Sequence, residues 1–355
     1  MKRVIYVTNH TGGVGFGGRE QLSLLHSEVL SEIFGSGFER IELDGVAGFS
    51  KLFGYINGVS RSSIAHVCER IRVSGARFVF LDGSNLGKLA EAIRESIRGV
   101  EIVTFFHNCE ARFFLGSLRQ HPSVHALAVL VANHRAERLS VRWSDKLICL
   151  NQRDSRQLER LYGRGATHII PMAMQDRLPI NLPQMPTPPS EIYALFVGGT
   201  FYANRQGIEW FVDHVAANSP IKTYVVGKGF EKWKDRLERN GNVKVIGSVD
   251  SLAPWYLGAH FVIAPIFDGS GMKTKVAEAL MFGKRVVGTP EAFAGYEAVV
   301  DSVGAVCETA PQFLAAVESE AARRFVGIDG ELRSHYEDRY SFRAARDQLT
   351  RILSA

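Results

Sequence analysis

The feature that most constrains the fold is an alternation of short apolar runs with amphipathic helical patterns. The apolar runs, each ending in glycine or a polar residue, lie at 3–8, 76–83, 101–108, 146–151, 193–199, 222–227, 243–247, 260–266 and 284–289. Helical patterns follow at 19–34, 86–96, 153–163, 207–216 and 230–240. Such alternation predicts parallel sheets with helices on both faces. We therefore expect an α/β protein of two doubly wound, Rossmann-like domains.

A proline-rich segment divides the chain near its middle. Residues 171–189 hold six of the twelve prolines, and a segment of that composition forms neither a helix nor a central strand. A chain of 355 residues is also long for a single core. We predict a first domain at 1–170, a linker at 171–190, a second domain at 191–330 and a C-terminal helix within 331–355.

Composition places the chain among soluble globular proteins, with 46% hydrophobic and 22% charged residues. The four cysteines are too widely spaced for a C-x-x-C pair, which favours free buried thiols; they are Cys68, Cys109, Cys149 and Cys307. The sequence enters its first strand without a signal-like segment, and its longest apolar run, 126–133, is far shorter than the ~18 residues of a membrane span. We expect a cytoplasmic location.

Positive charge is concentrated in the first half. Residues 1–170 hold 22 lysines and arginines against 16 acids, and the remainder holds 20 against 21. This imbalance indicates an anionic partner such as a membrane surface, a phosphate-bearing acceptor or nucleic acid, unless arginine is simply abundant in the organism. Residues 111–121 and 133–143 mix arginine with apolar side chains, as interfacial helices do, although helices packed on a sheet read similarly. No nucleic-acid recognition motif accompanies them, so we expect no nucleic acid partner.

A glycine-rich loop at 8–20 follows the first predicted strand and ends in Gly17 and Gly18. Such a loop lets the backbone approach an anion at a helix N-terminus. Residues 13–18 match G-x-G-x-x-G by letter, but Glu42 only loosely fits the expected ribose-binding acid. A Rossmann dehydrogenase and a merely flexible loop remain alternatives.

Polar residues end the strand predicted at 101–108. His107 and Asn108 stand at its end, and Glu110 and Arg112 follow. In doubly wound domains, residues at these strand ends face the ligand. His107 could contact a substrate hydroxyl or stabilise charge, and a purely structural histidine is the alternative.

The stretch DGSGMKTKVAEALMFGKRVVG, residues 268–288, places a glycine and lysine loop before a helix. The amides of five residues could face a diphosphate: Ser270, Gly271, Met272, Lys273 and Thr274. Lys273 and Lys275 supply positive charge, and Glu278, about one turn deeper, could accept hydrogen bonds from a ribose diol. A capped helix with solvated lysines is the alternative. Because no D-x-D occurs, we expect no metal ion and no other cofactor.

Residues 161–174, 195–215, 225–231 and 242–297 resemble the nucleotide-sugar-binding part of retaining glycosyltransferases of the GT-B fold, often called family 4. The resemblance is to bacterial enzymes that build capsule, exopolysaccharide or O-antigen chains. It implies two Rossmann-like domains facing a central cleft, with the terminal helix crossing back to the first domain. It also implies hexosyl transfer from a nucleoside diphosphate sugar to a glycan or lipid-linked acceptor. A GT-B epimerase and a non-catalytic sugar-nucleotide-binding subunit remain alternatives.

The resemblance also implies roles for individual residues. Glu278 would bind the ribose, Lys273 or Lys275 would neutralise the leaving diphosphate, and His107 would approach the donor sugar. Further contacts with the donor would come from Gly199, Lys228, Gly247 and Val249, and from the loop of Ser270 to Thr274. The first domain would add Gly17, Gly18, Asn108 and Glu110. Many relatives carry two glutamates with seven residues between them, the first of which contacts the sugar. Counting back from Glu278 in this way reaches Ser270, whereas matching the glycines reaches Asp268.

Overall fold

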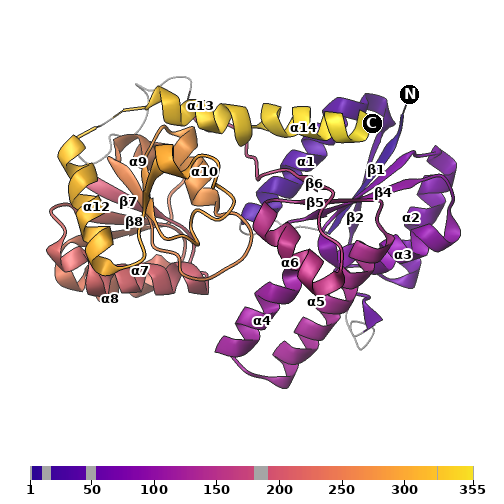
Figure 1. Ribbon diagram of the computed structural model, residues 1–355, viewed down its shortest axis with the longest axis horizontal. Coiled ribbons are helices and arrows are strands. Elements are labelled where there is room, and N and C mark those ends of the chain that lie inside the picture. Colours follow the sequence, from indigo (N-terminus) through magenta and orange to yellow (C-terminus); the bar gives the residue numbers. More distant parts are fainter. Residues whose placement is uncertain (1, 10–16, 45–52, 180–190, 326, 355) are drawn as a thin grey trace. The chain divides into compact units, whose positions relative to one another are not determined.

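The computed structural model describes residues 2–9, 17–44, 53–179, 191–325 and 327–354 (Figure 1). The chain divides into two compact units: the first comprises Met1–Met174 with Phe342–Ala355, and the second comprises Gln175–Ser341. Each unit has a six-stranded sheet in which the strand pairs are parallel. The predicted α/β class with two doubly wound domains is therefore confirmed.

The first unit has strands β1 Val4–Asn9, β2 Phe38–Leu43, β3 Phe78–Asp82, β4 Glu101–Phe106, β5 Lys146–Cys149 and β6 His168–Ile169. Its helices are α1 Gly18–Phe34, α2 Arg61–Ser74, α3 Gly87–Ser96, α4 Glu110–Gln120, α5 Val124–Trp143, α6 Gln152–Tyr162 and α14 Phe342–Ser354. Short 3₁₀ turns occur at η1 Gly35–Gly37 and η3 Ser84–Leu86.

The second unit has strands β7 Tyr193–Val197, β8 Lys222–Val226, β9 Val243–Gly247, β10 Phe261–Ala264, β11 Val286–Gly288 and β12 Gly304–Val306. Its helices are α7 Tyr202–His214, α8 Lys234–Leu237, α9 Ala253–Gly258, α10 Thr274–Met281, α11 Val300–Val303, α12 Ala310–Arg323 and α13 Gly330–Arg339. The 3₁₀ turns are η5 Ala216–Asn218, η6 Phe230–Trp233 and η7 Glu238–Asn240.

Strand order places one topological switch point in each sheet. The first sheet runs β2-β1-β3-β4-β5-β6 and the second runs β12-β11-β10-β7-β8-β9. The order therefore reverses between β1 and β3 in the first unit and between β7 and β10 in the second. Ligands of doubly wound sheets bind beyond the carboxyl ends of the strands at such points. The loops after these four strands are the places to look for a site.

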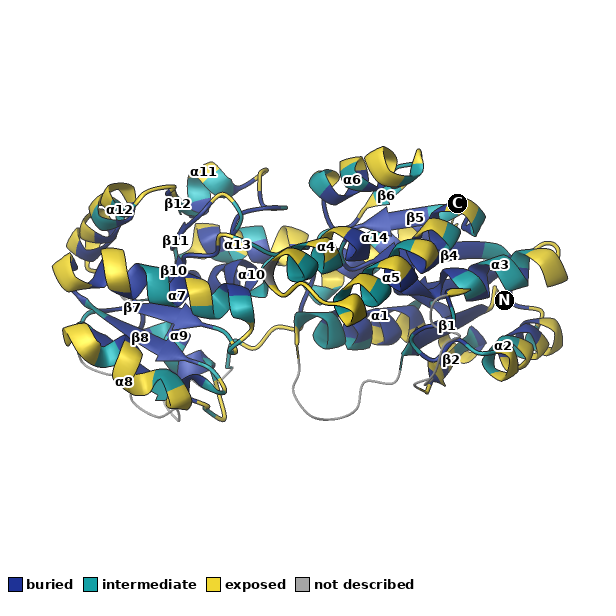
Figure 2. Ribbon diagram, turned by 90° about the horizontal axis from the view of Figure 1, so that it is seen from below, coloured by how far each residue is buried: buried dark blue, intermediate teal, exposed yellow. Residues whose placement is uncertain are grey.

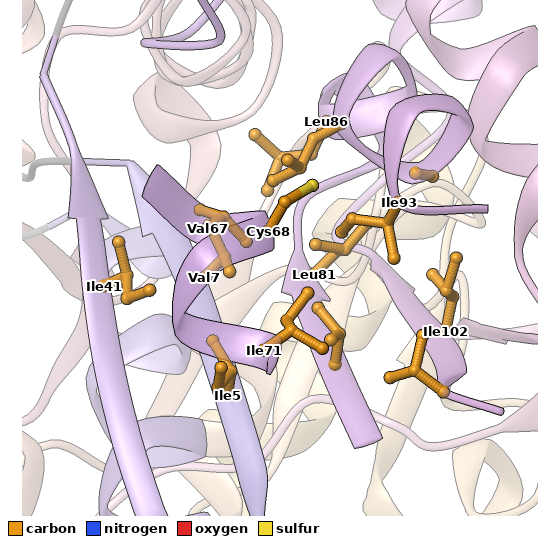
Figure 3. Packing of buried hydrophobic residues seen from close by; sticks show 14 of the residues in the cluster. Ile5, Val7, Ile41, Val67, Cys68, Ile71, Leu81, Leu86, Ile93 and Ile102 are labelled. Carbon is orange, nitrogen blue, oxygen red and sulfur yellow. The ribbon is translucent and has the colours of Figure 1, made fainter. Parts of the chain in front are cut away.

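The core of the first unit follows from the period-two pattern of its strands. Ile5 and Val7 of β1 point to the face covered by α2 and α3, where Val67, Ile71 and Ile93 pack against them (Figure 3). Tyr6, between them, points to the other face and lies 5.8 Å from the ring of Phe80. Because side chains alternate along a strand, an apolar run without polar breaks predicts a strand buried on both faces.

Local capping sets where several helices begin. Ser60 and Ser63 form a capping box at α2, and Thr309 and Gln312 form another at α12. Asn151 accepts a hydrogen bond from the Asp154 N–H at the start of α6. These side chains satisfy backbone donors that the first turn of a helix leaves unpaired.

Two predicted helices differ from the observed elements. The pattern at 230–240 forms η6, α8 and η7 rather than one helix, because i→i+3 bonds such as Lys232 N–H to Gly229 O tighten its turns. The segment 331–355 contains two helices, α13 and α14, and not one. Tyr340 leaves helical geometry at φ −121° and ψ 6° and is buried against Tyr296, so α13 ends there.

The terminal helix α14 packs within the first unit, against α1. Lys2 Nζ donates to Ser354 O at 3.2 Å, and Lys146 Nζ donates to Ile352 O at 2.7 Å. These cations meet the carbonyl end of the helix, where the dipole favours positive charge. All four cysteines are free and buried, as predicted. No described helix is long and apolar enough to cross a membrane.

Candidate functional site

Three strands of the second unit end side by side in glycine. Gly198 N–H donates to Val226 O at 3.1 Å, and Gly227 N–H donates to Gly247 O at 2.7 Å. A Cβ on Gly227 would lie 1.8 Å from Gly198 O, so a side chain there would push the ends of β7 and β8 apart. The predicted donor residues Gly199 and Gly247 therefore lie at the same carboxyl edge of the sheet, and Gly199 lies beside the switch point.

The loop between β10 and α10 folds around the ammonium of Lys273. Lys273 Nζ donates to Ser270 O and Gly271 O, both at 3.3 Å, and to Glu291 Oε1 at 2.8 Å. Positive φ at Gly269 (134°) and Gly271 (64°) gives the loop the curvature that this wrapping needs. Lys273 is also the N-cap residue of α10. A cation thus stands where the helix dipole already attracts anions.

Lys275, in the first turn of α10, is buried. Its Nζ donates to Asn204 Oδ1 at 2.8 Å and stands 4.3 Å from the centre of the Phe196 ring. Burial lowers the pKa of Lys275 to about 7, with Glu278 opposing the shift and Lys273 adding to it. Lys275 is therefore a cation whose charge is sensitive to its surroundings near neutral pH. Lys228, by contrast, is exposed at the end of β8.

Glu278 is buried on α10, as its position one turn into the helix predicts. Tyr256 donates its hydroxyl hydrogen to Glu278 Oε2 at 2.9 Å, and Arg177 Nη1 lies 3.8 Å from Oε1. Burial raises the pKa of Glu278, while the Tyr256 hydrogen bond and the charge of Arg177 oppose the rise. One carboxylate oxygen is thus held by a protein hydroxyl, and the other stands at ion-pair distance from a cation.

Asp268 and Ser270, the two positions that could correspond to the first of the paired glutamates in relatives, have different surroundings. Asp268 Oδ1 accepts from the Gly269 N–H at 2.7 Å, and Asp268 Oδ2 accepts from the Tyr202 hydroxyl at 3.2 Å. Ser270 offers its carbonyl to Lys273. The acid that pairs with Lys273 is Glu291, which follows β11 and was not predicted from the sequence.

Met272 and Val249, two further residues predicted to bind the donor, differ in burial. Met272 is buried, and a Cβ on Gly295 would lie 2.4 Å from its Cγ, so this side chain packs into the domain. Val249 is half-buried after β9. Thr274 is the first residue of α10 and is also half-buried.

Glu231 joins the loops after β8 and β9. Its Oε2 accepts from the Gly229 N–H at 2.7 Å, and its Oε1 accepts from the Ser248 N–H at 2.6 Å. Hydrogen bonds from the backbone N–H of Glu231 itself, and then from those of Ser248 and Gly229, lower the pKa of the Glu231 carboxyl. An exposed carboxylate therefore occupies two backbone donors beside Gly247, at the position where the resemblance expects the base.

Asp82 is the centre of the corresponding edge in the first unit. It ends β3, is fully buried, and receives hydrogen bonds from His26 Nδ1 at 2.9 Å, from Thr8 Oγ1 at 3.5 Å and from the Ser23 hydroxyl. Burial acts to raise the pKa of Asp82, but His107 and His26 outweigh it and hold the pKa well below its usual range. A buried carboxylate thus stays ionised at the switch point between β1 and β3.

His107 lies directly beside Asp82, as its place at the end of β4 predicts. Its Nε2 is 3.2 Å from Asp82 Oδ1, but neither ring nitrogen makes an aligned hydrogen bond with the described residues. The ring packs edge-on to Phe105 at 5.1 Å. Burial lowers the pKa of His107, with Asp82 opposing the shift. A neutral imidazole with unsatisfied nitrogens is suited to hydrogen-bonding a sugar hydroxyl.

Glu110 stands near His107 at the start of α4 and is paired with a second buried acid, Glu137 of α5. Glu137 accepts hydrogen bonds from the N–H groups of Glu110 and Ala111 at 3.0 and 3.2 Å, and so caps α4 from a neighbouring helix. Burial raises the pKa of Glu110 to about 7; the charge of Arg19 opposes the rise and that of Glu137 adds to it. Glu110 therefore titrates near neutral pH.

The remaining predicted residues of the first unit lie close to this edge. Gly17 is the N-cap residue of α1, and its carbonyl accepts from the Gln21 N–H at 3.1 Å; Gly18 begins that helix. Asn108 is half-buried, and its Oδ1 makes no hydrogen bond with the described residues. Residues 10–16 of the glycine-rich loop lie outside the described residues. Within the part of the chain that is described, no cluster of three metal-ligating side chains occurs.

Several site residues were missed by the sequence analysis. Asp82 carries the same signal that identified His107, a polar residue directly after a buried strand, and could have been found. Tyr256, Asn204 and Glu137 come from other elements and meet their partners only in the folded chain. No local pattern marks them.

Solved structures share this fold over nearly the full length of the chain. The Anabaena protein HepE in complex with UDP is 15% identical, with a TM-score of 0.70 and 99% of each chain covered. A sucrose-phosphate synthase from Thermosynechococcus elongatus is 14% identical, with a TM-score of 0.75 and coverage of 100% of this chain and 98% of that one. A lipopolysaccharide outer core galactosyltransferase, WaaB, is 13% identical, with a TM-score of 0.68 and 99% of each chain covered. At these identities the similarity shows the fold, which is GT-B.

Residues 191–322 match the sequence profile of the family described as glycosyl transferases group 1. The predicted resemblance to glycosyl transferases of group 1 is confirmed over these residues, which lie in the second unit. This match also confirms the predicted enzyme class for that domain. No curated protein sequence matches the chain.

Proposed function

We propose that this protein is a retaining glycosyltransferase that moves a sugar from a nucleoside diphosphate sugar to a glycan or lipid-linked acceptor, in the synthesis of a bacterial surface polysaccharide. One observation carries the proposal. Glu278 is buried one turn below the loop that wraps Lys273, at the switch point of a domain that matches the glycosyltransferase profile. This arrangement suits a ribose below and a diphosphate above.

In the proposal Glu278 accepts hydrogen bonds from the ribose, and Arg177 gives way to the nucleotide. The amides of the loop residues Ser270 to Thr274, together with Lys273, Lys275 and Lys228, balance the diphosphate. The backbone from Gly247 to Val249 faces the base, which requires Glu231 to release the Ser248 N–H. HepE was solved with UDP and with UDP-glucose, so a uridine nucleotide sugar is the first donor to test.

The transfer breaks the bond between the anomeric carbon and the diphosphate oxygen and forms a bond from that carbon to the acceptor oxygen. Positive charge develops on the sugar and negative charge on the departing diphosphate. Groups already aimed at the diphosphate stabilise this state more than the ground state. The acceptor attacks from the face that the diphosphate leaves, and its proton passes to the diphosphate, so configuration is retained. Lysines and a helix N-terminus supply the stabilisation, and we propose that no metal ion is needed.

His107 is proposed to hydrogen-bond a hydroxyl of the donor sugar through one of its unsatisfied ring nitrogens. Asp82 acts as a positioning residue, because its buried charge stands 3.2 Å from His107 Nε2. Glu110 and Asn108 complete the polar edge of the first unit. We also propose that the protein works at the inner face of the cytoplasmic membrane, where lipid-linked acceptors are found.

The test is incubation with a panel of nucleoside diphosphate sugars, with and without candidate acceptors, in buffer containing a chelator. We expect release of nucleoside diphosphate that depends on the acceptor, and a product with the donor's anomeric configuration. Conversion of a donor without any acceptor would favour an epimerase. Donor binding without turnover on any acceptor would favour a binding subunit. Loss of activity with the chelator would contradict metal-independent transfer.

A further inference from the structure

A groove of about 720 Å³ lies on the first unit between α4, α5 and α6. Its apolar lining includes Leu115, Leu130, Val131 and Leu161. Figure 1 shows α4 and α5 projecting from the sheet as a helical pair, and Figure 2 shows exposed and half-buried residues along both. Neither Asp82 nor His107 is among the described residues that line the groove.

The aliphatic side chains of this groove are unusually exposed. Leu115 is 37% exposed, Val131 43% and Leu161 47%. Along α5 the same face continues through Leu127 at 50% and Val124 at 87%, at the helical spacing of an apolar stripe. A contiguous apolar surface of this kind marks an interaction site more often than a free face.

Both charged side chains among the described residues that line the groove are arginines. Arg112 and Arg160 line it, and both are exposed. Arg138, one turn along α5 from His134, is exposed as well and helps lower the pKa of that histidine. No aspartate or glutamate is among the described residues that line it. The occupant that complements this surface is apolar in its body and anionic at its end.

A network of hydrogen bonds links α4, α5 and α6 at the floor of the groove. His134 Nδ1 lies 3.2 Å from the Tyr162 hydroxyl, which donates to Glu137 Oε2 at 2.8 Å. Glu137 in turn caps the first turn of α4 through Glu110 and Ala111. Each of the three helices is thus tied to Glu137, and the groove is preformed. Its described lining contains no phenylalanine, tyrosine or tryptophan, the residues that protein interfaces favour.

We propose that this groove takes an acyl chain of an anionic phospholipid and docks the first unit on a bilayer surface. The lipid phosphate meets Arg112 and Arg160 at the rim, and the apolar stripe from Val124 to Leu161 contacts the acyl region. The inference deepens the membrane location in the proposed function and does not depend on the transfer chemistry.

The test is co-sedimentation of the full chain with vesicles of phosphatidylcholine, alone or mixed equally with phosphatidylglycerol. We expect binding to the mixed vesicles that weakens at high salt, and little binding to phosphatidylcholine. Arg112→Ala with Arg160→Ala should weaken binding roughly 30-fold, from about fivefold for each arginine near an anionic surface. Leu115→Glu with Val131→Glu should abolish it. Matched controls on α2 are Arg72→Ala and Val73→Glu, both at exposed positions, and these should bind as the unaltered protein does.

The proposal is overturned if the unaltered protein ignores mixed vesicles, or if the α2 controls lose binding equally. It is also overturned if the groove substitutions change the molar mass in solution without affecting vesicles, because a second copy then covers the groove. Should the glutamate variant not fold, hydrogen exchange of the unaltered protein decides: vesicles must protect α4, α5 and α6. Thermal stabilisation by nucleotide sugars, measured on the same variants, reports the proposed function separately.

Discussion

The carboxyl edges of the two sheets occupy equivalent positions in their domains but carry different residues. In the second unit three neighbouring strands end in glycine, with the Glu231 carboxylate beside Gly247. The loop after a fourth strand, β10, bends through Gly269 and Gly271 around Lys273. In the first unit the strand ends carry buried ionisable side chains, with Asp82 between His26 and His107. The edge of the second unit thus presents backbone groups and lysines, whereas the edge of the first unit presents buried histidines and a buried carboxylate.

This difference fits a division of labour. A diphosphate has the same shape and charge whatever sugar it carries, so glycines and lysines suffice to hold it. A sugar hydroxyl is neutral and directional, so a histidine held by a buried carboxylate is better suited to it. We therefore expect substitutions in the second unit to affect donor binding and diphosphate departure, and those in the first unit to affect the pH dependence of turnover.

The largest effect should be a difference in how the two units respond to pH. The pKa of Glu110 is raised to about 7 from an unfolded value near 4.3, so the folded state binds more protons between these values. Stability should therefore fall by about 4 kcal/mol as pH rises through this window, and Glu110→Gln should remove the fall. The pKa of Lys275 is lowered to about 7, so its contribution runs the other way: stability rises as pH increases from about 7 toward 10, and Lys275→Met removes the rise. Urea unfolding over a pH series measures both, and parallel curves for variant and unaltered protein would contradict the assignment.

Lys273→Ala should lower kcat roughly 100-fold, because it removes a cation aimed at developing negative charge. KM for the donor should change less. Lys273→Gln is the matched control: it can still bond to Glu291 and the loop carbonyls but carries no charge. Steady-state kinetics should show the loss in both variants. If Lys273→Gln keeps full turnover, the lysine only shapes the loop.

Glu278→Ala should weaken donor affinity roughly 30-fold, or about 2 kcal/mol, with a smaller effect on kcat at saturation. Part of this effect comes from the Tyr256 hydroxyl, which loses its buried acceptor. Glu278→Gln keeps that acceptor and tests the charge alone. Titration calorimetry with the nucleotide sugar measures both variants, and unchanged affinity in both would remove Glu278 from the site.

Asp82→Asn should lower kcat roughly tenfold while leaving donor affinity nearly unchanged, since Asp82 acts through His107. The pKa of His107 is held up by the charge of Asp82 against the effect of burial. Removing that charge should move the acid limb of the pH–rate profile to lower pH. A purely structural role would lower the melting temperature without moving this limb.

The sequence predicted the parts of the molecule that rest on local patterns. Buried runs such as Phe78–Asp82 and helix patterns such as Gly18–Phe34 follow from periodicity. His107 was identified from its place after a strand, and Glu278 from its place one turn into the helix that follows the glycine and lysine loop. The network that makes them a site comes from residues distant in the chain. Tyr256 reaches Glu278 across 22 positions, and Asn204 reaches Lys275 across 71. Contacts at such separations depend on strand order, which propensity does not encode.

The proposed function requires the strand ends of the second unit to hold the nucleotide sugar. Hydrogen exchange of the full chain with and without saturating nucleoside diphosphate sugar tests it most directly. The account predicts protection of the backbone at 268–278, 227–231 and 247–250, and no comparable protection in α4, α5 and α6. Protection confined to the first unit, or none at residues 268–278 while the ligand is bound, would contradict it.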